Sequence, residues 1–395
     1  MKKLLVIGAG FLQSFVIKKA KEMGYTVVAV DANPNAEGFA YADKYAVINI
    51  VDAQACLEYA KAEQIDGVLT AATDYGVLTA SYIAQELNLP GLKYSVAKMV
   101  KNKYQTRKCL FDNNVDDAEQ AYEVGENTDI TELQAKLHYP VMVKPCDGSG
   151  SRGATRVDNA EKLKAACDCA IGASITKRAT IETFIVGREY GAETLVIDGK
   201  PYVLAIMRKW MTEPPYYAEL GHAIPSDLTP EVEEKARKCV ENAIKALGIN
   251  FGSVNMDMLI TPNGEVYIVD IGARMGGNLI GSHIIYAGTG IDYMAAMICN
   301  AVGDPVDLTA KAKTAVATRL LAFDGGVVTT MPDMKELERK YGVVIEHHMK
   351  LGDTVNAYRT NLDGCGYIVA VDTDVDLAAT KAENVLSKVR SIVFS

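Results

Sequence analysis

Cationic residues and glycines gather in the segment YPVMVKPCDGSGSRG, which spans residues 139–153. Its apolar start predicts a strand that leads into a glycine-rich loop. Glycines allow backbone N–H groups to turn towards an anion, and neighbouring hydroxyl and cationic side chains add donors and charge. The residues that would act on the anion are Lys144, Gly148, Ser149, Gly150, Ser151, Arg152 and Gly153. The pattern predicts a polyphosphate site, and a hairpin with a glycine-rich turn and a surface lysine is the structural alternative.

The loop is not of the Walker A type. That motif reads GxxxxGK[ST], with the lysine after the glycines and a helix directly behind it. Here Lys144 precedes the glycines. The order predicts a nucleotide held between β-structures.

Two aspartates interrupt apolar strands that a short turn connects. Asp257 lies in SVNMDMLI and Asp270 in VYIVDIGAR, with a turn at residues 262–264 between them. Two carboxylates buried in facing strands are costly unless a cation neutralises them. Mg²⁺ favours carboxylates together with substrate phosphates. We therefore predict that both aspartates hold magnesium, and a structural pairing with Arg274 is the alternative.

A further acidic set lies in IETFIVGREYGAETLV, residues 181–196. Glu182 ends an apolar strand, and Glu189 and Glu193 follow in the next one. Side chains repeat every two residues along a strand, so Glu189 and Glu193 face the same way. A solvated strand face would explain the same spacing.

The first turn of the chain imitates a dinucleotide-binding fingerprint. Gly8 and Gly10 follow the first strand and Asp31 ends the second, but the third glycine of GxGxxG would fall at Gln13. We interpret the segment as a plain strand-to-helix turn, and an NAD-dependent oxidoreductase is the alternative. Asp31 and the pair at 73–74 fall on the rim where open α/β sheets bind polar ligands.

Composition limits the class of protein. The 395 residues exceed the size of a single core and predict two or three domains. A net charge of −9 disfavours nucleic acid as a partner. The eight cysteines show neither CxxC nor metal-ligand spacing, which favours a reduced, cytoplasmic protein. No apolar run is long enough to span a membrane.

The hydrophobic pattern predicts an α/β region followed by α+β regions. Strands at 3–8, 26–31 and 65–70 with helices at 12–23 and 52–63 predict a parallel βαβαβ sheet. Residues 95–120 read as helical. Further strands are predicted at 140–145, 179–186, 190–197, 202–207, 252–260, 265–271 and 366–372, and further helices at 230–247, 333–340 and 376–390. The predicted domains are 1–95, 96–310 with a nucleotide-binding lid at about 120–190, and 311–395.

In its motif order the chain resembles the ATP-grasp superfamily. The order is the glycine loop, E-x-F-I-x-G-x-E at 182–189, and a hairpin with two acidic residues followed by Arg274. More narrowly it resembles the carboxylate–amine ligases related to L-amino acid ligases. The likeness covers nearly the whole chain and implies an ATP-grasp fold with a Rossmann-like pre-ATP-grasp domain and a C-terminal α+β domain.

The resemblance implies ATP and Mg²⁺ as cofactors. The residues implied to bind the nucleotide are Lys103, Lys144, Gly148, Ser149, Gly150, Ser151, Gly153, Glu182, Thr183, Phe184, Ile185 and Glu189. Of these, the lysines would contact the phosphates, the backbone at 183–185 the adenine, and Glu189 the ribose. Asp257 and Asp270 would hold magnesium, and Arg274 would lie against the transferred phosphate or the acyl-phosphate.

One position departs from the family. The usual string E-x-N-x-R has an asparagine that binds metal, whereas this chain has Gly272. A glycine offers no side-chain ligand, so a second magnesium would be held more weakly or by water. Asn255 and Asn278 are the candidates to replace the missing amide.

The segment YYAELGHAIP, residues 216–225, resembles the one that lines the acceptor site in amino acid ligases. Glu219 would meet a substrate ammonium, and His222 would accept a proton from the attacking amine, although a hydrogen-bonded structural histidine is an equal alternative. Residues 208–210 are candidates to hold a carboxylate. Gly276, Gly277 and Asn278 offer donors near the reacting centre.

We therefore expect an ATP- and magnesium-dependent ligase that joins a small carboxylic acid to an amine, with Arg274, Lys144 and His222 as its catalytic residues. A carboxylate is a poor electrophile, so it would first take the γ-phosphate of ATP and become an acyl-phosphate. An amine, or less often a thiol, would then displace the phosphate. The partners are small molecules, with a homodimer as one option for assembly, and a non-catalytic nucleotide-binding protein is a further alternative.

Overall fold

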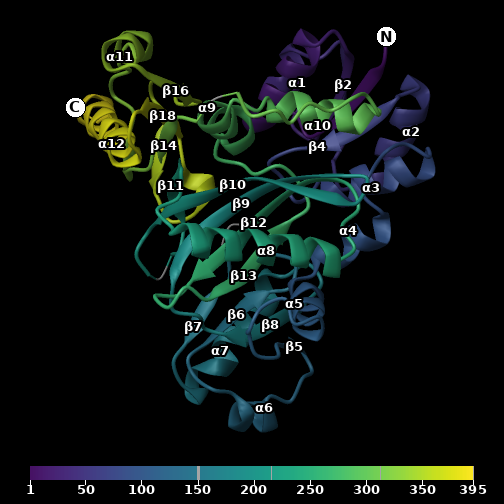
Figure 1. The fold of residues 1–395 in the computed structure, drawn as a ribbon, viewed down its shortest axis with the longest axis vertical. Coiled ribbons are helices and arrows are strands. Elements are labelled where there is room, and N and C mark those ends of the chain that lie inside the picture. The colour runs from purple at the N-terminus through teal and green to yellow at the C-terminus, as the bar shows by residue number, and fades with distance from the viewer. Residues whose placement is uncertain (149–151, 215, 312, 395) are drawn as a thin grey trace.

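The computed structural model describes residues 1–148, 152–214, 216–311 and 313–394. Three residues of the predicted phosphate loop, Ser149, Gly150 and Ser151, lie outside these ranges. Figure 1 shows the N-terminal and C-terminal regions side by side at one end of the molecule, a wide sheet across its middle, and a small sheet at the other end.

The N-terminal region is a parallel sheet, as the alternation of strands and helices predicts. The strand order is β3-β2-β1-β4. The strands are β1 (Lys3–Ile7), β2 (Thr26–Asp31), β3 (Lys44–Val47) and β4 (Gly67–Thr70). The helices are α1 (Phe11–Glu22), α2 (Ala53–Glu63) and α3 (Val77–Glu86), with a 3₁₀ turn η1 (Glu37–Ala40). The sequence did not indicate β3, because this short edge strand is mostly exposed and has no apolar pattern.

Two helices lead from this region to the small sheet. They are α4 (Tyr94–Lys101) and α5 (Lys103–Asp112), divided at Asn102, whose side chain caps α5. The prediction of helix up to residue 120 is wrong. Helix α5 ends at Asp112, and Asn114 follows with a left-handed φ of 51°. Asp116 then binds the buried Arg107 with both oxygens, at 2.6 and 2.9 Å.

The small sheet is antiparallel, in the order β5-β8-β6-β7. Its strands are β5 (Tyr122–Gly125), β6 (Val141–Pro145), β7 (Thr155–Val157) and β8 (Arg178–Thr183). The accompanying helices are α6 (Thr131–Lys136), η2 (Ala160–Lys162) and α7 (Leu163–Ala173). Val143 of β6, Ile181 of β8 and Leu163 of α7 are fully buried in a core of their own, so this unit packs as a separate layer.

The large sheet has the order β13-β12-β9-β10-β11-β14-β18-β16, and its neighbouring strands are antiparallel. Its strands are β9 (Arg188–Ile197), β10 (Lys200–Met211), β11 (Glu219–Ile224), β12 (Gly252–Ile260), β13 (Val266–Gly272), β14 (Ala315–Leu320), β16 (Val343–His347) and β18 (Gly366–Asp372). Helix α8 (Pro230–Ala246) packs on one face, and it begins at Pro230 because Thr229 caps it. The tail strands therefore continue the sheet that carries the hairpin, and the predicted boundary at 310 stays a prediction.

The remaining elements lie beside the middle and tail strands of this sheet or between it and the N-terminal sheet. They are η3 (Ile280–Ile284), α9 (Ile285–Thr289), α10 (Tyr293–Val302), β15 (Asp324–Val327), α11 (Met334–Tyr341), β17 (Thr354–Ala357), η4 (Asn361–Asp363) and α12 (Val375–Val393). Ile298 of α10 and Leu4 of β1 belong to one buried apolar core. That core joins the N-terminal sheet to the large sheet and fixes the rim of the first against the second.

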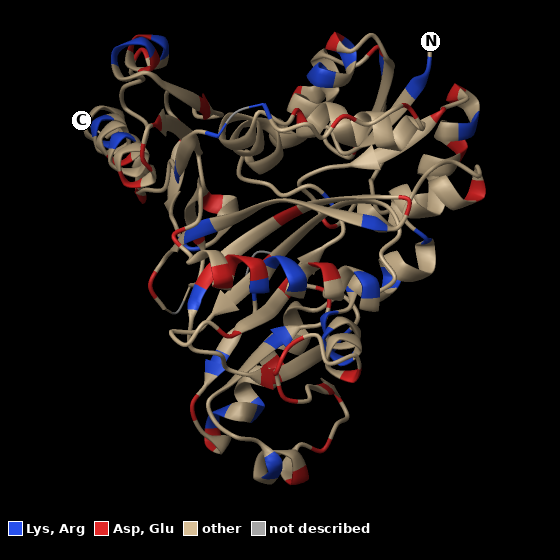
Figure 2. Ribbon diagram, viewed as in Figure 1, with Lys and Arg blue, Asp and Glu red and all other residues tan. Residues whose placement is uncertain are grey.

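Charged residues of both signs are interspersed over the ribbon in Figure 2. On α8, for example, Arg237 pairs with Glu233 and Lys245 with Glu241, each one helical turn apart. Exposed pairs of this kind contribute only about 0.3–0.5 kcal/mol each. Among the described residues, no helix combines the length and apolarity needed to cross a membrane.

We predict that Gly221→Ala destabilises the protein. A Cβ at Gly221 would lie 2.1 Å from the carbonyl oxygen of Thr318, so strands β11 and β14 would have to move apart. Overpacking of this kind costs about 1–3 kcal/mol. Gly172→Ala is the control, since a Cβ there has no atom of the described chain within 4 Å, and alanine in a helix is expected to be neutral or stabilising by up to about 1 kcal/mol. Urea unfolding measures both, and equal midpoints for the two variants would contradict the close approach.

Candidate active site

A cavity of about 780 Å³ lies between the small and the large sheet. Strand β6 supplies Lys144, the end of β8 and the following turn supply residues 182–187, and β12 and β13 supply the opposite wall. The described residues predicted to bind the nucleotide line it, apart from Gly153: Lys103, Lys144, Gly148, Glu182, Thr183, Phe184, Ile185 and Glu189. Motifs that are far apart in the sequence therefore meet around one space.

Gly153 has a different place in the loop. Its φ is +73°, and a Cβ there would lie 2.9 Å from the Ala173 Cβ and 3.1 Å from Pro145. Glycine is required at this position by the backbone and by the close approach of α7. It shapes the loop rather than lining the cavity.

Lys144 lies between the two sheets. Its Nζ donates to the Glu182 carboxylate at 3.0 Å and to the Val269 carbonyl oxygen at 3.3 Å. The lysine side chain is 17% exposed and the glutamate 11%. The ammonium thus points into the cavity while both neighbours fix its position.

The predicted hairpin forms, and Asp257 of β12 is the direct cross-strand partner of Asp270 of β13. Two lysines neutralise the pair. Lys209 Nζ lies 2.8 Å from Asp257 Oδ1, and Lys103 donates to Asp270 Oδ1. The alternative was a structural pairing of the aspartates with Arg274. Among the described residues, the ion-pair partners of the two aspartates are Lys209 and Lys103 instead.

The two aspartates differ in their proton affinity. Burial raises the pKa of Asp257, and the nearby Glu219 and Asp270 carboxylates add to this effect against the attraction of Lys209. Burial would also raise the pKa of Asp270, but Lys103 outweighs it and holds that pKa below its usual value. The hairpin therefore presents an ionised carboxylate at Asp270.

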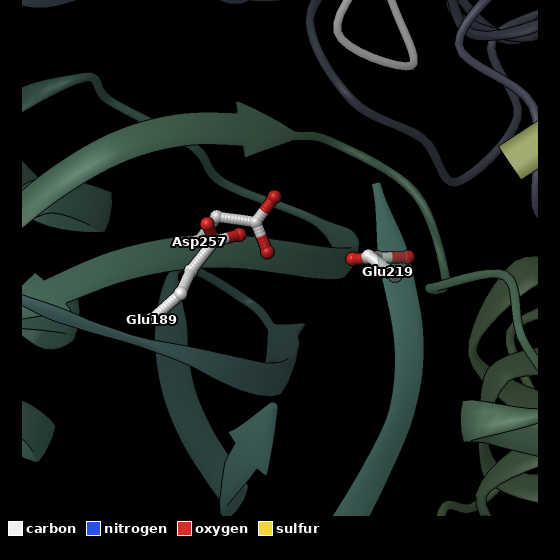
Figure 3. Close-up of side chains that lie close together, drawn as sticks. All are labelled: Glu189, Glu219 and Asp257. Atoms are coloured by element: carbon white, nitrogen blue, oxygen red, sulfur yellow. The ribbon is translucent and has the colours of Figure 1, made fainter. Parts of the chain in front are cut away.

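The carboxylates of Glu189, Glu219 and Asp257 lie close together (Figure 3), and Lys209 contacts all three. Its Nζ lies 2.7 Å from Glu189, 2.6 Å from Glu219 and 2.8 Å from Asp257, and the side chain is 1% exposed. Burial alone would lower the pKa of Lys209, but these anions hold it well above the usual value. Figure 3 shows that the Asp257 carboxylate points towards Glu219, which belongs to a different strand.

Arg274 lines a second, smaller cavity of about 40 Å³. Its Nε lies 2.9 Å from Asp74 on the rim of the N-terminal sheet, and an NH group donates to Asn255 at 3.3 Å. The two cavities share four lining residues: Lys103, Gly148, Asp257 and Asp270. These four therefore mark the place where the two spaces meet.

The donor set of the hairpin suits magnesium. Carboxylate oxygens are the ligands that Mg²⁺ prefers, and both lysine contacts of the aspartates use the Oδ1 atoms. A Cβ at Gly272 would lie 2.9 Å from the Arg274 guanidinium carbon. The guanidinium thus covers the space that a side chain at position 272 would enter.

Two family models match the chain. Residues 137–282 match the ATP-grasp domain, and residues 319–393 match the L-amino acid ligase C-terminal domain 2. The first match contains the hairpin and the lining of the larger cavity, except Lys103, Arg107, Ala118 and Glu119, and the second contains most of the tail strands and α12. The chain contains an ATP-grasp domain. The predicted family and fold are thereby confirmed.

Individual relatives agree with this assignment. Protein y4rH of Sinorhizobium fredii is 26% identical over 79% of this chain and 65% of its own length. D-alanine–D-alanine ligase B of Chromobacterium violaceum is 31% identical over 38% of this chain and 50% of that protein. The alignments thus cover only half to two thirds of these relatives. The crystal structure of L-amino acid ligase from Bacillus licheniformis shares the fold, with a TM-score of 0.84 and 22% identity over 100% and 99% of the two chains.

Of the predicted substrate residues, Arg274 lines the smaller cavity, and the others lie outside the lining of the two cavities. Glu219 contacts Lys209. His222 lies opposite Lys209 on the neighbouring strand, is 1% exposed, and has its Nε2 atom 3.7 Å from Glu219. Asn278 donates to Glu219. Gly276 donates its N–H to the buried Glu193 at 3.1 Å, and a Cβ at Gly277 would have room, its nearest contact being Leu12 at 3.6 Å.

Glu193, which accepts the N–H of Gly276, is fully buried. It accepts hydrogen bonds from Tyr293 at 2.7 Å and from Asn255 at 3.0 Å, besides that of Gly276. Burial raises its pKa to about 7 against the hydrogen bonds, which lower it. The spacing argument put Glu193 on the same face as Glu189, and the solvated face proposed as the alternative is wrong.

Three site residues were not indicated by the sequence. Tyr358, Asn361 and Tyr367 of the tail contact Glu219 or Asn278. Asn361 lies 142 residues after Glu219, and no motif or periodicity joins the two. Only the tertiary pairing of the tail with the large sheet brings them together.

The contacts of the first turn support its interpretation as a plain turn. The backbone N–H of Ala9 donates to the Asp31 carboxylate at 2.8 Å, and Gln13 is buried with its Nε2 2.6 Å from the Ala71 carbonyl oxygen. The groups that would receive a pyrophosphate are thus engaged within the N-terminal sheet.

We predict that Lys144→Ala weakens ATP binding by tenfold to a hundredfold. The variant removes a charged donor of the cavity, and hydrogen bonds to charged groups contribute about 1.5–3 kcal/mol. Trp210, the single tryptophan of the chain, lines the cavity and reports binding through its fluorescence. Lys136→Ala is the control, because this lysine is 65% exposed on α6. A folded Lys144→Ala protein with unchanged ATP affinity would remove the lysine from the phosphate site.

Proposed function

We propose that the protein is an ATP- and magnesium-dependent ligase that activates a small carboxylic acid, with an amino acid as the favoured class, and joins it to an amine. ADP and phosphate are the other products. The observation that carries the proposal is the sharing of Lys103, Gly148, Asp257 and Asp270 by the nucleotide cavity and the Arg274 cavity. A γ-phosphate at that junction would adjoin an acid in the smaller space.

The activation step needs cations around the transferred phosphoryl group. Lys103 and Lys144 border the nucleotide cavity, and Arg274 borders the smaller one. The acid oxygen attacks the γ-phosphorus, the bond to the β-phosphate oxygen breaks, and ADP leaves. Positioning and cationic donors supply most of the catalysis in such transfers.

Magnesium would be held by Asp257 and Asp270, and it would neutralise negative charge on the ATP phosphates. The protein's own part is to orient both carboxylates through the β12–β13 register. The acceptor amine then attacks the acyl carbon, the C–O bond to phosphate breaks, and His222 accepts the proton that the amine loses. Glu219 and His222 are the groups we propose for this half of the reaction, with a thiol acceptor as the alternative.

We predict that Asp270→Asn lowers turnover by at least a hundredfold at saturating magnesium. The substitution removes one of the two proposed metal ligands and leaves Lys103 with a neutral partner. Phosphate release measures the rate. Asp168→Asn, an exposed position on α7, is the control. Near-wild-type turnover of Asp270→Asn would refute the metal role of the hairpin.

We predict that acid labelled with ¹⁸O in its carboxylate transfers one labelled oxygen to the released phosphate. The label moves because the acid oxygen bonds to the γ-phosphorus before the amine arrives. Mass spectrometry of the phosphate checks this, with unlabelled acid in ¹⁸O-water as the control. Release of AMP and pyrophosphate in place of ADP would overturn the mechanism.

A further inference from the structure

We propose that the C-terminal domain completes the amine side of the active site, with Asn361 as a positioning residue for Glu219. The inference rests on the proposed ligase function. It assigns the C-terminal strands a part in recognising an acceptor that arrives as an ammonium ion.

Asn361 holds Glu219 at two points. Its Nδ2 donates to Glu219 Oε2 at 2.9 Å, and its Oδ1 accepts the backbone N–H of Glu219 at 3.1 Å. Only this orientation of the amide satisfies both contacts, because the reverse would set an oxygen against the carboxylate. The side chain thus fixes both the strand and the carboxylate that extends from it.

The turn that carries Asn361 is itself held in place. Asp363 accepts the backbone N–H of Thr360 at 2.9 Å and of Arg359 at 3.2 Å, which closes a capping box at the start of η4. Tyr358 donates its hydroxyl to the Glu219 carbonyl oxygen. The amide therefore reaches the carboxylate from a fixed support.

A second chain of hydrogen bonds from the C-terminal strands ends at the same atom, Glu219 Oε2. The hydroxyl of Tyr367 on β18 donates to Asn278 Oδ1 at 3.1 Å, and Asn278 Nδ2 donates to Glu219 Oε2. Tyr367 is 9% exposed and Asn278 is 6% exposed. Two amides, one held by Tyr358 and η4 and the other by Tyr367, fix one carboxylate oxygen.

The other oxygen faces Lys209, which lines the larger cavity. Glu219 Oε1 lies 2.6 Å from Lys209 Nζ and 3.7 Å from His222 Nε2. An ammonium that approaches Glu219 therefore meets Oε1, because Oε2 is occupied by amide donors. A lysine ammonium already lies beside this atom, so the site suits a cation of that kind.

The test separates the amine step from the activation step. Hydroxylamine traps an acyl-phosphate as a hydroxamate and is largely uncharged at pH 8, so it does not need an ammonium site. The probe acid and amine are the pair of common L-amino acids that releases most phosphate in a screen of all twenty. For Asn361→Ala we expect kcat/KM for the amine to fall by about tenfold or more, as for the loss of a hydrogen bond to a charged group. The fall in the rate of hydroxamate formation should be at least five times smaller.

Two further variants keep the test decisive. Asn361→Asp sets a carboxylate against Glu219 and should reduce the amine kcat/KM more than alanine does, although its size is unchanged. Tyr367→Phe removes only a hydroxyl and should give a smaller loss in the same direction. Asn356→Ala is the control, since this exposed asparagine of the same region contacts Asp363 rather than Glu219.

The outcomes are distinct. Equal losses in ligation and in hydroxamate formation, or no loss in either, would overturn the role of Asn361 and leave the ligase function standing. A wild-type protein that forms neither hydroxamate nor ligated product with any acid of the screen would overturn the proposed function and this inference with it.

Discussion

The structure of the site depends on one constraint, the direct opposition of Asp257 and Asp270 across the β12–β13 hairpin. Like charges in neighbouring strands destabilise a sheet unless cations lie beside them. The cations come from outside the hairpin, Lys103 from the start of α5 and Lys209 from β10. Helix α5 and strand β10 are thereby fixed relative to the hairpin. The same four side chains line the nucleotide cavity.

Gly272 belongs to this arrangement. Because it has no side chain, the Arg274 guanidinium lies against the strand and reaches Asp74 across the boundary with the N-terminal sheet. An asparagine at this position would displace the guanidinium. Arg274 therefore links the large sheet to the rim of the N-terminal sheet beside the smaller cavity.

Local patterns were sufficient for much of the fold and of the nucleotide side of the site. Alternating apolar residues and the turn at 262–264 predicted the hairpin and its facing aspartates, and the strand before the glycine loop carries Lys144 to the lining of the larger cavity. The end of α5 was mispredicted, because Asp116 and Arg107 are held by the edge of β13 rather than by their neighbours in sequence. The group around Lys209 could not be predicted either. Its members Glu189, Lys209 and Asp257 lie on β9, β10 and β12. The registers of these three strands bring them together, since Gly191 of β9 lies opposite both Met207 of β10 and Asp257 of β12.

The number of donors on each lysine distinguishes their roles. An ammonium has three N–H groups. Those of Lys209 match its three carboxylate partners, Glu189, Glu219 and Asp257, so this lysine is saturated by the protein. Lys144 has two such contacts among the described residues, to Glu182 and Val269, and a third donor is available towards the cavity. Lys144 is therefore better suited than Lys209 to bind a phosphate oxygen without first losing a partner, while Lys209 serves to hold three anions of different strands together.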